Sequence, residues 1–390
     1  MMKKIICIIF ILILLSPVTV YADSTGDMQK GDTYDAQVNS IDTQNIEKFI
    51  DQLNRETESY LPPLNLKSFI SMFKSEGGGY SLTGLLNGML KYFFNDVLLN
   101  AKLLSQLVIL SIICAILKNL ENAFSSENIS NLAYYACYLV LIIIIVKSFT
   151  LAVGIGRDTI NKMVDFMTAM LPVLISLLTS VGGFASASIF DPLIMIMVQI
   201  ISTAVKNIII PLIFLNVILS IVNNISDTFQ VTKLADLLKQ IVKWGLGFML
   251  TVFVGIITIR GTAVKSLDQV TVKTAKFAID NFIPVVGKCL SDAISTIAGY
   301  SLVLKDAIST FGLIALVILC IFPLIKIITL VLIFKVTGAL IQPISDKRII
   351  ECLNSVGDSL TLIFASVLCV AIMFFIMITV MASTGKMAVS

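Results

Sequence analysis

Long blocks of apolar residues alternate with short polar stretches over most of this chain. Seven blocks occupy about residues 98–117, 132–152, 164–183, 193–222, 245–260, 311–334 and 359–382. A helix needs about 20 apolar residues to cross the ~30 Å of hydrocarbon in a bilayer, and most blocks approximate that length. The pattern predicts an all-α polytopic membrane protein with about seven transmembrane helices within residues 97–384, followed by a short tail at 385–390.

The N-terminal region has a different composition. Residues 1–22 combine Lys3 and Lys4 with an apolar core at 5–15 and the small-residue end Val20-Tyr21-Ala22. This is the pattern of a cleaved secretory signal peptide, and an uncleaved anchor helix is the alternative. Cleavage would leave the new N-terminus outside, so residues 23–96 are predicted to form a small extracytoplasmic region.

Helical periodicity runs through this extracytoplasmic region. The spacing i, i+3, i+4, i+7 places apolar residues on one face of two predicted helices, and a third, at 82–97, runs into the first span. The third helix is predicted to lie along the membrane interface. A small helical cap packed on itself is the alternative. The two faces consist of Ile46, Phe49, Ile50 and Leu53, and of Leu66, Phe69, Ile70 and Phe73.

The block at 193–222 has an unusual length. Thirty residues at ~1.5 Å each span about 45 Å, too long for one upright helix and short for two. Because Lys206 and Pro211 lie near its middle, a tilted, kinked or broken helix is predicted. Gly154-x-Gly156, between two other blocks, is interpreted as a turn.

Charged residues inside apolar blocks are candidates for function. A charge at the bilayer centre costs about 2.5–3.5 kcal/mol, so such a lysine should face protein or water. The functional interpretation is the polar lining of a conduit. The alternatives are snorkelling, hydrogen bonds to carbonyls that a proline frees, and ordinary interhelical hydrogen bonds. The candidate conduit or helix-break residues are Lys206, Asn207, Pro211, Asn216, Pro323 and Lys326.

Proline spacing indicates an internal repeat. The number of residues between Pro172 and Pro211 is the same as between Pro284 and Pro323. This spacing indicates that residues 132–243 and residues 244–357 are two copies of one unit. If 283–303 crosses the membrane, the copies would run in opposite directions, as in many transporters. A re-entrant or interfacial segment at 283–303, and coincidence among nine prolines, are the alternatives. Residues 231–243 and 264–280 are predicted to be surface helices that lie on headgroups or dock partners.

Composition excludes several classes of function. The chain has 390 residues, 57% of them hydrophobic, and no histidine, which removes His-based catalysis and most zinc and haem sites. The formal net charge of +3 gives no basis for nucleic-acid binding. A Walker A motif and CxxC spacing are both missing, so the seven cysteines are predicted to pack in the interior. We therefore predict that the chain is not an enzyme and has no catalytic, cofactor or metal site.

Short stretches in a fixed order resemble the stage III sporulation protein AE family of endospore-forming bacteria. The stretches run from about residue 45 to residue 382. They include Asn122-Ala123-Phe124, Pro211-Leu212-Ile213-Phe214-Leu215, Val231-Thr232-Lys233-Leu234-Ala235, Asn281-Phe282-Ile283-Pro284-Val285 and Phe322-Pro323-Leu324-Ile325-Lys326.

The resemblance implies a membrane subunit of the sporulation channel complex, similar to a secretion or feeding apparatus, that links the mother cell to the forespore. It implies a place in the mother-cell membrane surrounding the forespore and a role in forespore development after engulfment. The implied partners are other membrane proteins of the same operon, its cytoplasmic ATPase and a forespore membrane protein. An autonomous secondary transporter and a non-conducting membrane scaffold are the alternatives.

Overall fold

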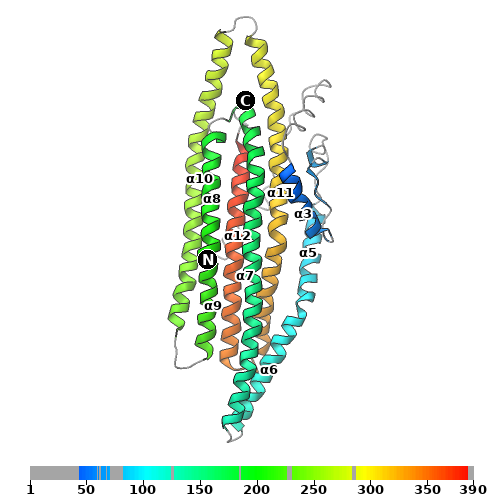
Figure 1. The fold of residues 1–390 in the computed structure, drawn as a ribbon, viewed down its shortest axis with the longest axis vertical. Helices are drawn as coiled ribbons and strands as arrows, with labels where there is room; N and C mark the ends of the chain where they lie inside the picture. Colours follow the sequence, from blue (N-terminus) through cyan, green and yellow to red (C-terminus); the bar gives the residue numbers. More distant parts are fainter. Residues whose placement is uncertain are drawn as a thin grey trace. The chain divides into compact units, whose positions relative to one another are not determined.

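The computed structural model describes residues 44–58, 60, 63–66, 68–70, 82–123, 127–183, 186–225, 231–282 and 287–384, and this part of the chain contains no strand. The signal segment 1–22 and the tail 385–390 lie outside the described residues. The main elements (Figure 1) are α3 (Gln44–Thr57), α5 (Leu82–Leu99), α6 (Ala101–Ala123), α7 (Glu127–Ser180), the π-helical η1 (Ser186–Phe190), α8 (Asp191–Ala204), the π-helical η2 (Val205–Ile209), α9 (Ile210–Ile225), α10 (Thr232–Phe282), α11 (Gly287–Ile341) and α12 (Lys347–Ser383).

The prediction of an all-α polytopic membrane protein is confirmed, whereas the number of about seven spans stays a prediction. The described residues contain six segments that are long and apolar enough to cross a membrane: Asn87–Asn119, Ala133–Ser180, Ser186–Asn224, Thr232–Gly261, Thr296–Ile341 and Lys347–Ser383. The predicted blocks 132–152 and 164–183 belong to one helix, α7, of 54 residues. At ~1.5 Å per residue α7 is about 81 Å long, well beyond the ~30 Å that one crossing requires.

The turn predicted at Gly154-x-Gly156 is therefore wrong. Both glycines lie inside α7, and Gly156 is buried against α12. A Cβ added to Gly156 would lie 3.1 Å from Ile363 Cγ2 and 3.4 Å from Val367 Cγ2. Glycine thus permits a close approach of two membrane helices here, which is a common role for small residues in such bundles.

Two predicted surface helices are also parts of longer elements. Residues 232–243 form the first turns of α10, and 264–280 lie in its last part, so neither is a separate helix. Residues 287–303 likewise form the beginning of α11, which continues to Ile341 without a break. This segment is therefore the extension of a span, not a separate re-entrant element.

The core lies where α7, α11 and α12 meet. The most extensive packing of α11 is against α12, followed by α7, and α12 also packs against α9. In Figure 1, α12 and α7 lie between α10 with α8–α9 on one side and α11 with α5–α6 on the other. Phe149, Phe166 and Phe374 are fully buried, whereas Trp244 and Phe248 of α10 are largely exposed. Exposed apolar side chains of this kind are suited to lipid.

The predicted amphipathic helices of the N-terminal region pack onto the bundle. Ile46, Ile50 and Leu53 of α3 are buried, as the periodicity predicts. The ring of Phe49 lies 5.2 Å from that of Phe166 in α7, and Lys162 pairs with Glu56 at 2.6 Å. The second predicted face is buried where it is described, at Leu66, Phe69 and Ile70, while Phe73 lies outside the described residues.

The internal repeat stays a prediction. Pro172 lies inside α7 and Pro323 inside α11, whereas Pro211 is the second residue of α9. Pro284 lies outside the described residues, between α10 and α11.

Candidate functional site

The six candidate residues from the sequence lie in three separate environments. Lys206 and Asn207 belong to η2, the π-helical turn just before Pro211. Proline has no N–H and its ring clashes with the carbonyl four residues earlier, so a widened turn at this place has a direct physical cause. The predicted irregularity of this long block is therefore present. Lys206 Nζ donates to Asn161 Oδ1 of α7 at 3.0 Å, while Asn207 is exposed.

Asn216 occupies the second environment, inside the bundle. Its side chain is completely buried, and Nδ2 donates to Ser359 Oγ of α12 at 3.0 Å. Among the described residues, Asn216 Oδ1 has no hydrogen-bond partner. A buried carbonyl oxygen without a partner is costly, which makes this position notable in an apolar bundle.

Pro323 and Lys326 form the third environment, on the opposite face of the core. Lys326 is exposed and interacts electrostatically with Asp96 of α5. Next to Pro323, the ring of Phe322 packs edge-on against Tyr92 of α5, with centroids 4.6 Å apart. Lys206 and Lys326 therefore contact α7 and α5 respectively, and the structure does not bring them together.

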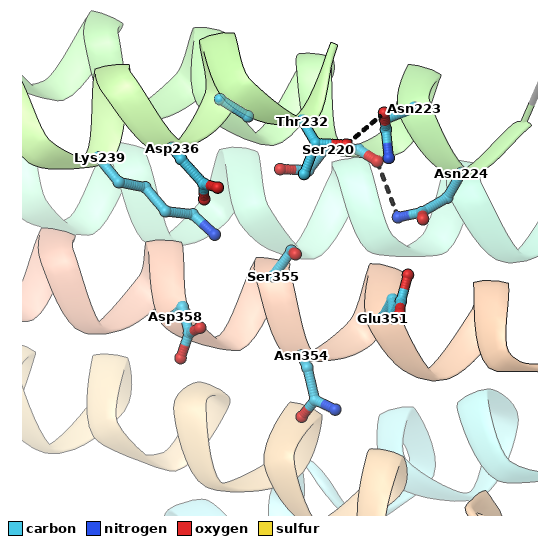
Figure 2. Close-up of a pocket in the computed structure, with 11 residues that line it drawn as sticks. Ser220, Asn223, Asn224, Thr232, Asp236, Lys239, Glu351, Asn354, Ser355 and Asp358 are labelled. Atoms are coloured by element: carbon cyan, nitrogen blue, oxygen red, sulfur yellow. Dashed lines mark hydrogen bonds between the residues drawn. The ribbon is translucent and has the colours of Figure 1, made fainter. Parts of the chain in front are cut away.

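A polar cavity lies elsewhere, where α9 ends and α10 and α12 begin (Figure 2). Its volume is about 290 Å³. Side chains of all three helices line it: Ser220, Asn223, Asn224, Thr232, Ala235, Asp236, Lys239, Glu351, Asn354, Ser355 and Asp358.

The cavity wall is fixed by a capping interaction. Asn223 Oδ1 accepts from the Val231 N–H at 3.0 Å and from Thr232 Oγ1 at 2.9 Å. The first turn of α10 has unsatisfied backbone donors, as every helix start does, and a side chain from the end of α9 supplies an acceptor just before it. The two helices are thereby held in register at the cavity.

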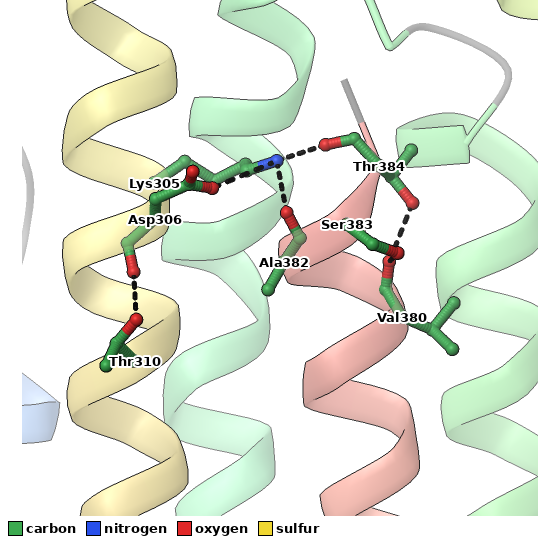
Figure 3. A network of polar contacts seen from close by, with 7 residues as sticks. All are labelled: Lys305, Asp306, Thr310, Val380, Ala382, Ser383 and Thr384. Carbon is green, nitrogen blue, oxygen red and sulfur yellow. Dashed lines mark hydrogen bonds and ion pairs between the residues drawn. The ribbon is translucent and has the colours of Figure 1, made fainter. Parts of the chain in front are cut away.

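Buried charged side chains lie near the opposite end of the bundle. Arg260 of α10 pairs with Asp191 at the start of α8, and their side chains are 3% and 0% exposed. Lys305 of α11, also buried, donates to the carbonyl of Ala382 at 2.9 Å and to that of Thr384 (Figure 3). A cation at a helix C-terminus satisfies the last carbonyls and opposes the helix dipole, so Lys305 caps α12.

Comparison with known proteins identifies the family. A family model described as stage III sporulation protein AE matches residues 64–385. The chain belongs to this family. It is 36% identical over 348 residues to the stage III sporulation protein AE of Bacillus subtilis (strain 168), with 89% of this chain and 87% of that relative covered. No solved structure gives a significant match.

The family membership and the fold together describe a multi-pass membrane protein with a part in sporulation. The matched region begins within the N-terminal helical segment and continues to the end of α12. The resemblance seen in short sequence stretches is therefore confirmed over most of the chain.

The cavity was missed at the sequence level, although a signal for it exists. Asn216, Ser220 and Asn224 repeat every four residues on α9, and Glu351, Ser355 and Ser359 do so on α12. Side chains four residues apart share one face of a helix, so each set forms a polar stripe. The contact between Asn216 and Ser359 shows that the two stripes face each other.

Proposed function

We propose that this chain is a membrane subunit of the sporulation channel complex, which links the mother cell and the forespore. It would lie in the mother-cell membrane that surrounds the forespore and act in forespore development after engulfment. The match to the stage III sporulation protein AE family over residues 64–385 carries this proposal, because that region includes all six candidate spans.

The architecture supports a role in a membrane assembly, because the bundle offers exposed apolar helix faces and a polar cavity at one end. The proposed partners are the other membrane proteins of the operon, its cytoplasmic ATPase and a forespore membrane protein.

The first test is made in sporulating cells. A strain that lacks this gene should stop after engulfment, and a tagged copy that restores spore formation should co-isolate with the other membrane proteins of the operon. Spore yield equal to the wild type in the deletion strain would refute the proposed role. Solute movement by the purified protein alone in liposomes would favour an autonomous transporter.

The role of Lys206 in a conduit can be tested separately. Lys206→Leu removes the hydrogen bond to Asn161, and Lys147→Leu is the matched control, because Lys147 is an exposed lysine of α7. We expect Lys206→Leu to reduce spore yield at least tenfold with normal protein level and location, while the control sporulates normally. Normal yield in both variants would remove Lys206 from any conduit.

A further inference from the structure

The cavity between α9, α10 and α12 has a buried polar floor. Ser220 and Asn224 line it and are only 6% and 7% exposed. Asn224 Nδ2 donates to the backbone carbonyl of Ser220 at 2.8 Å. Among the described residues, neither the Ser220 hydroxyl nor Asn224 Oδ1 has a hydrogen-bond partner. A hydroxyl and an amide oxygen without a partner are available to hydrogen-bond a polar molecule in the cavity.

The walls of the cavity carry three carboxylates and one lysine, and lysines outside the cavity pair with two of these carboxylates. Asp236 and Lys239 come from α10, and Glu351 and Asp358 from α12 (Figure 2). Asp358 pairs with Lys335 at 2.7 Å, and Glu351 lies 3.7 Å from Lys347. Asp236 and Lys239 have no ion pair in the described part of the chain.

We propose that this cavity binds a small hydrophilic solute that carries an ammonium group. Asp236 is the carboxylate of the cavity that has no ion pair among the described residues, so it can accept from a cationic group, and the floor offers a hydroxyl and an amide oxygen as acceptors for N–H donors. Ligand pockets typically measure about 300–1,000 Å³, so a cavity of about 290 Å³ suits a molecule the size of an amino acid or a short diamine.

The position of the cavity gives such a solute access from water. It lies at the ends of the helices, beside the start of α10 and α12, and not in the middle of a span. Its inner end is bounded by the buried pair Asn216–Ser359, one turn further along both polar stripes. The site is a property of the single chain, so it can be measured without the proposed complex.

The test is solute binding to the full-length protein, purified in detergent. Radiolabelled putrescine and lysine serve as probes, with succinate and glucose as competitors that lack an ammonium group. The variants are Asp236→Asn, Glu351→Gln and Ser220→Ala. The matched controls are Asp158→Asn, an exposed carboxylate of α7, and Ser366→Ala, a buried serine of α12 whose hydroxyl donates to the Leu362 carbonyl at 2.8 Å.

We expect saturable binding of putrescine or lysine that excess succinate and glucose do not displace. Loss of one charge-assisted hydrogen bond should weaken binding by about tenfold or more in each carboxylate variant. The control variants should bind like the wild type, and thermal unfolding of every variant should show that it remains folded. Absence of saturable binding in the millimolar range, or equal affinity in folded cavity variants and controls, would overturn the proposal.

Discussion

At the scale of single residues, the pair Asp191–Arg260 places two opposite charges inside the bundle. Both groups are almost fully removed from water, with exposures of 0% and 3%. Moving each charge from water into a medium of low polarity costs free energy. The attraction between the two charges offsets much of this desolvation cost, but only while both are present. The pair therefore contributes more to holding α8 against α10 in one arrangement than to net stability.

A double substitution can separate these two contributions. Arg260→Met leaves the Asp191 charge buried, and we expect it to lower the free energy of unfolding by about 3–5 kcal/mol. Asp191→Leu combined with Arg260→Met removes both charges and should recover most of that loss. Thermal unfolding of the detergent-purified protein measures the effect, with Arg157→Met, an exposed arginine of α7, as the control. A double variant as unstable as the single variant would contradict this account.

The sequence predicted which single residues are unusual only where the neighbouring residues in the chain made them stand out. Lys206 and Asn216 stood out because they are polar within an apolar block, but their partners did not. Asn216 bonds to a serine 143 positions further along the chain, and no periodicity connects the two. Such a partner depends on how distant helices pack.

At the scale of elements, hydropathy predicted where helices cross but not where they end. Residues 153–163 contain glycines and charges, so the pattern indicated a loop between two spans. The helix continues because these residues still make backbone hydrogen bonds, and Thr159, Ile160 and Met163 are buried on its inner face. A fall in hydropathy marks the end of an apolar surface, not the end of a helix.

Cysteine labelling can distinguish one crossing by α7 from two. If α7 crosses once, Asn119→Cys before it and Ser180→Cys at its end lie on opposite sides of the membrane. Two crossings would place both positions on the same side. We expect an impermeant thiol reagent to label only one of them in intact cells, and both after permeabilisation. The background should be a functional variant without native cysteines, since Cys137 is partly exposed.

At the scale of the whole molecule, the number of membrane crossings determines whether the two ends of the chain lie on the same side of the membrane. Six crossings return the chain to its starting side, so α3 and the end of α12 share a compartment, whereas seven would separate them. The polar cavity lies at the beginning of α12 and therefore at the other side. The distribution of lysine and arginine did not determine orientation, because the two sides carry similar numbers of positive charges.

Cleavage of the predicted signal peptide would determine the absolute orientation. If export begins at residue 23, α3 and the C-terminus lie outside and the cavity opens to the cytoplasm. Alkaline phosphatase fused after Ser390 should be active, and a fluorescent protein fused there should not fold. Ser355→Cys, in the cavity wall, should react with an impermeant reagent only after permeabilisation. An inactive phosphatase fusion together with labelling of Ser355→Cys in intact cells would reverse the orientation and place the solute site outside.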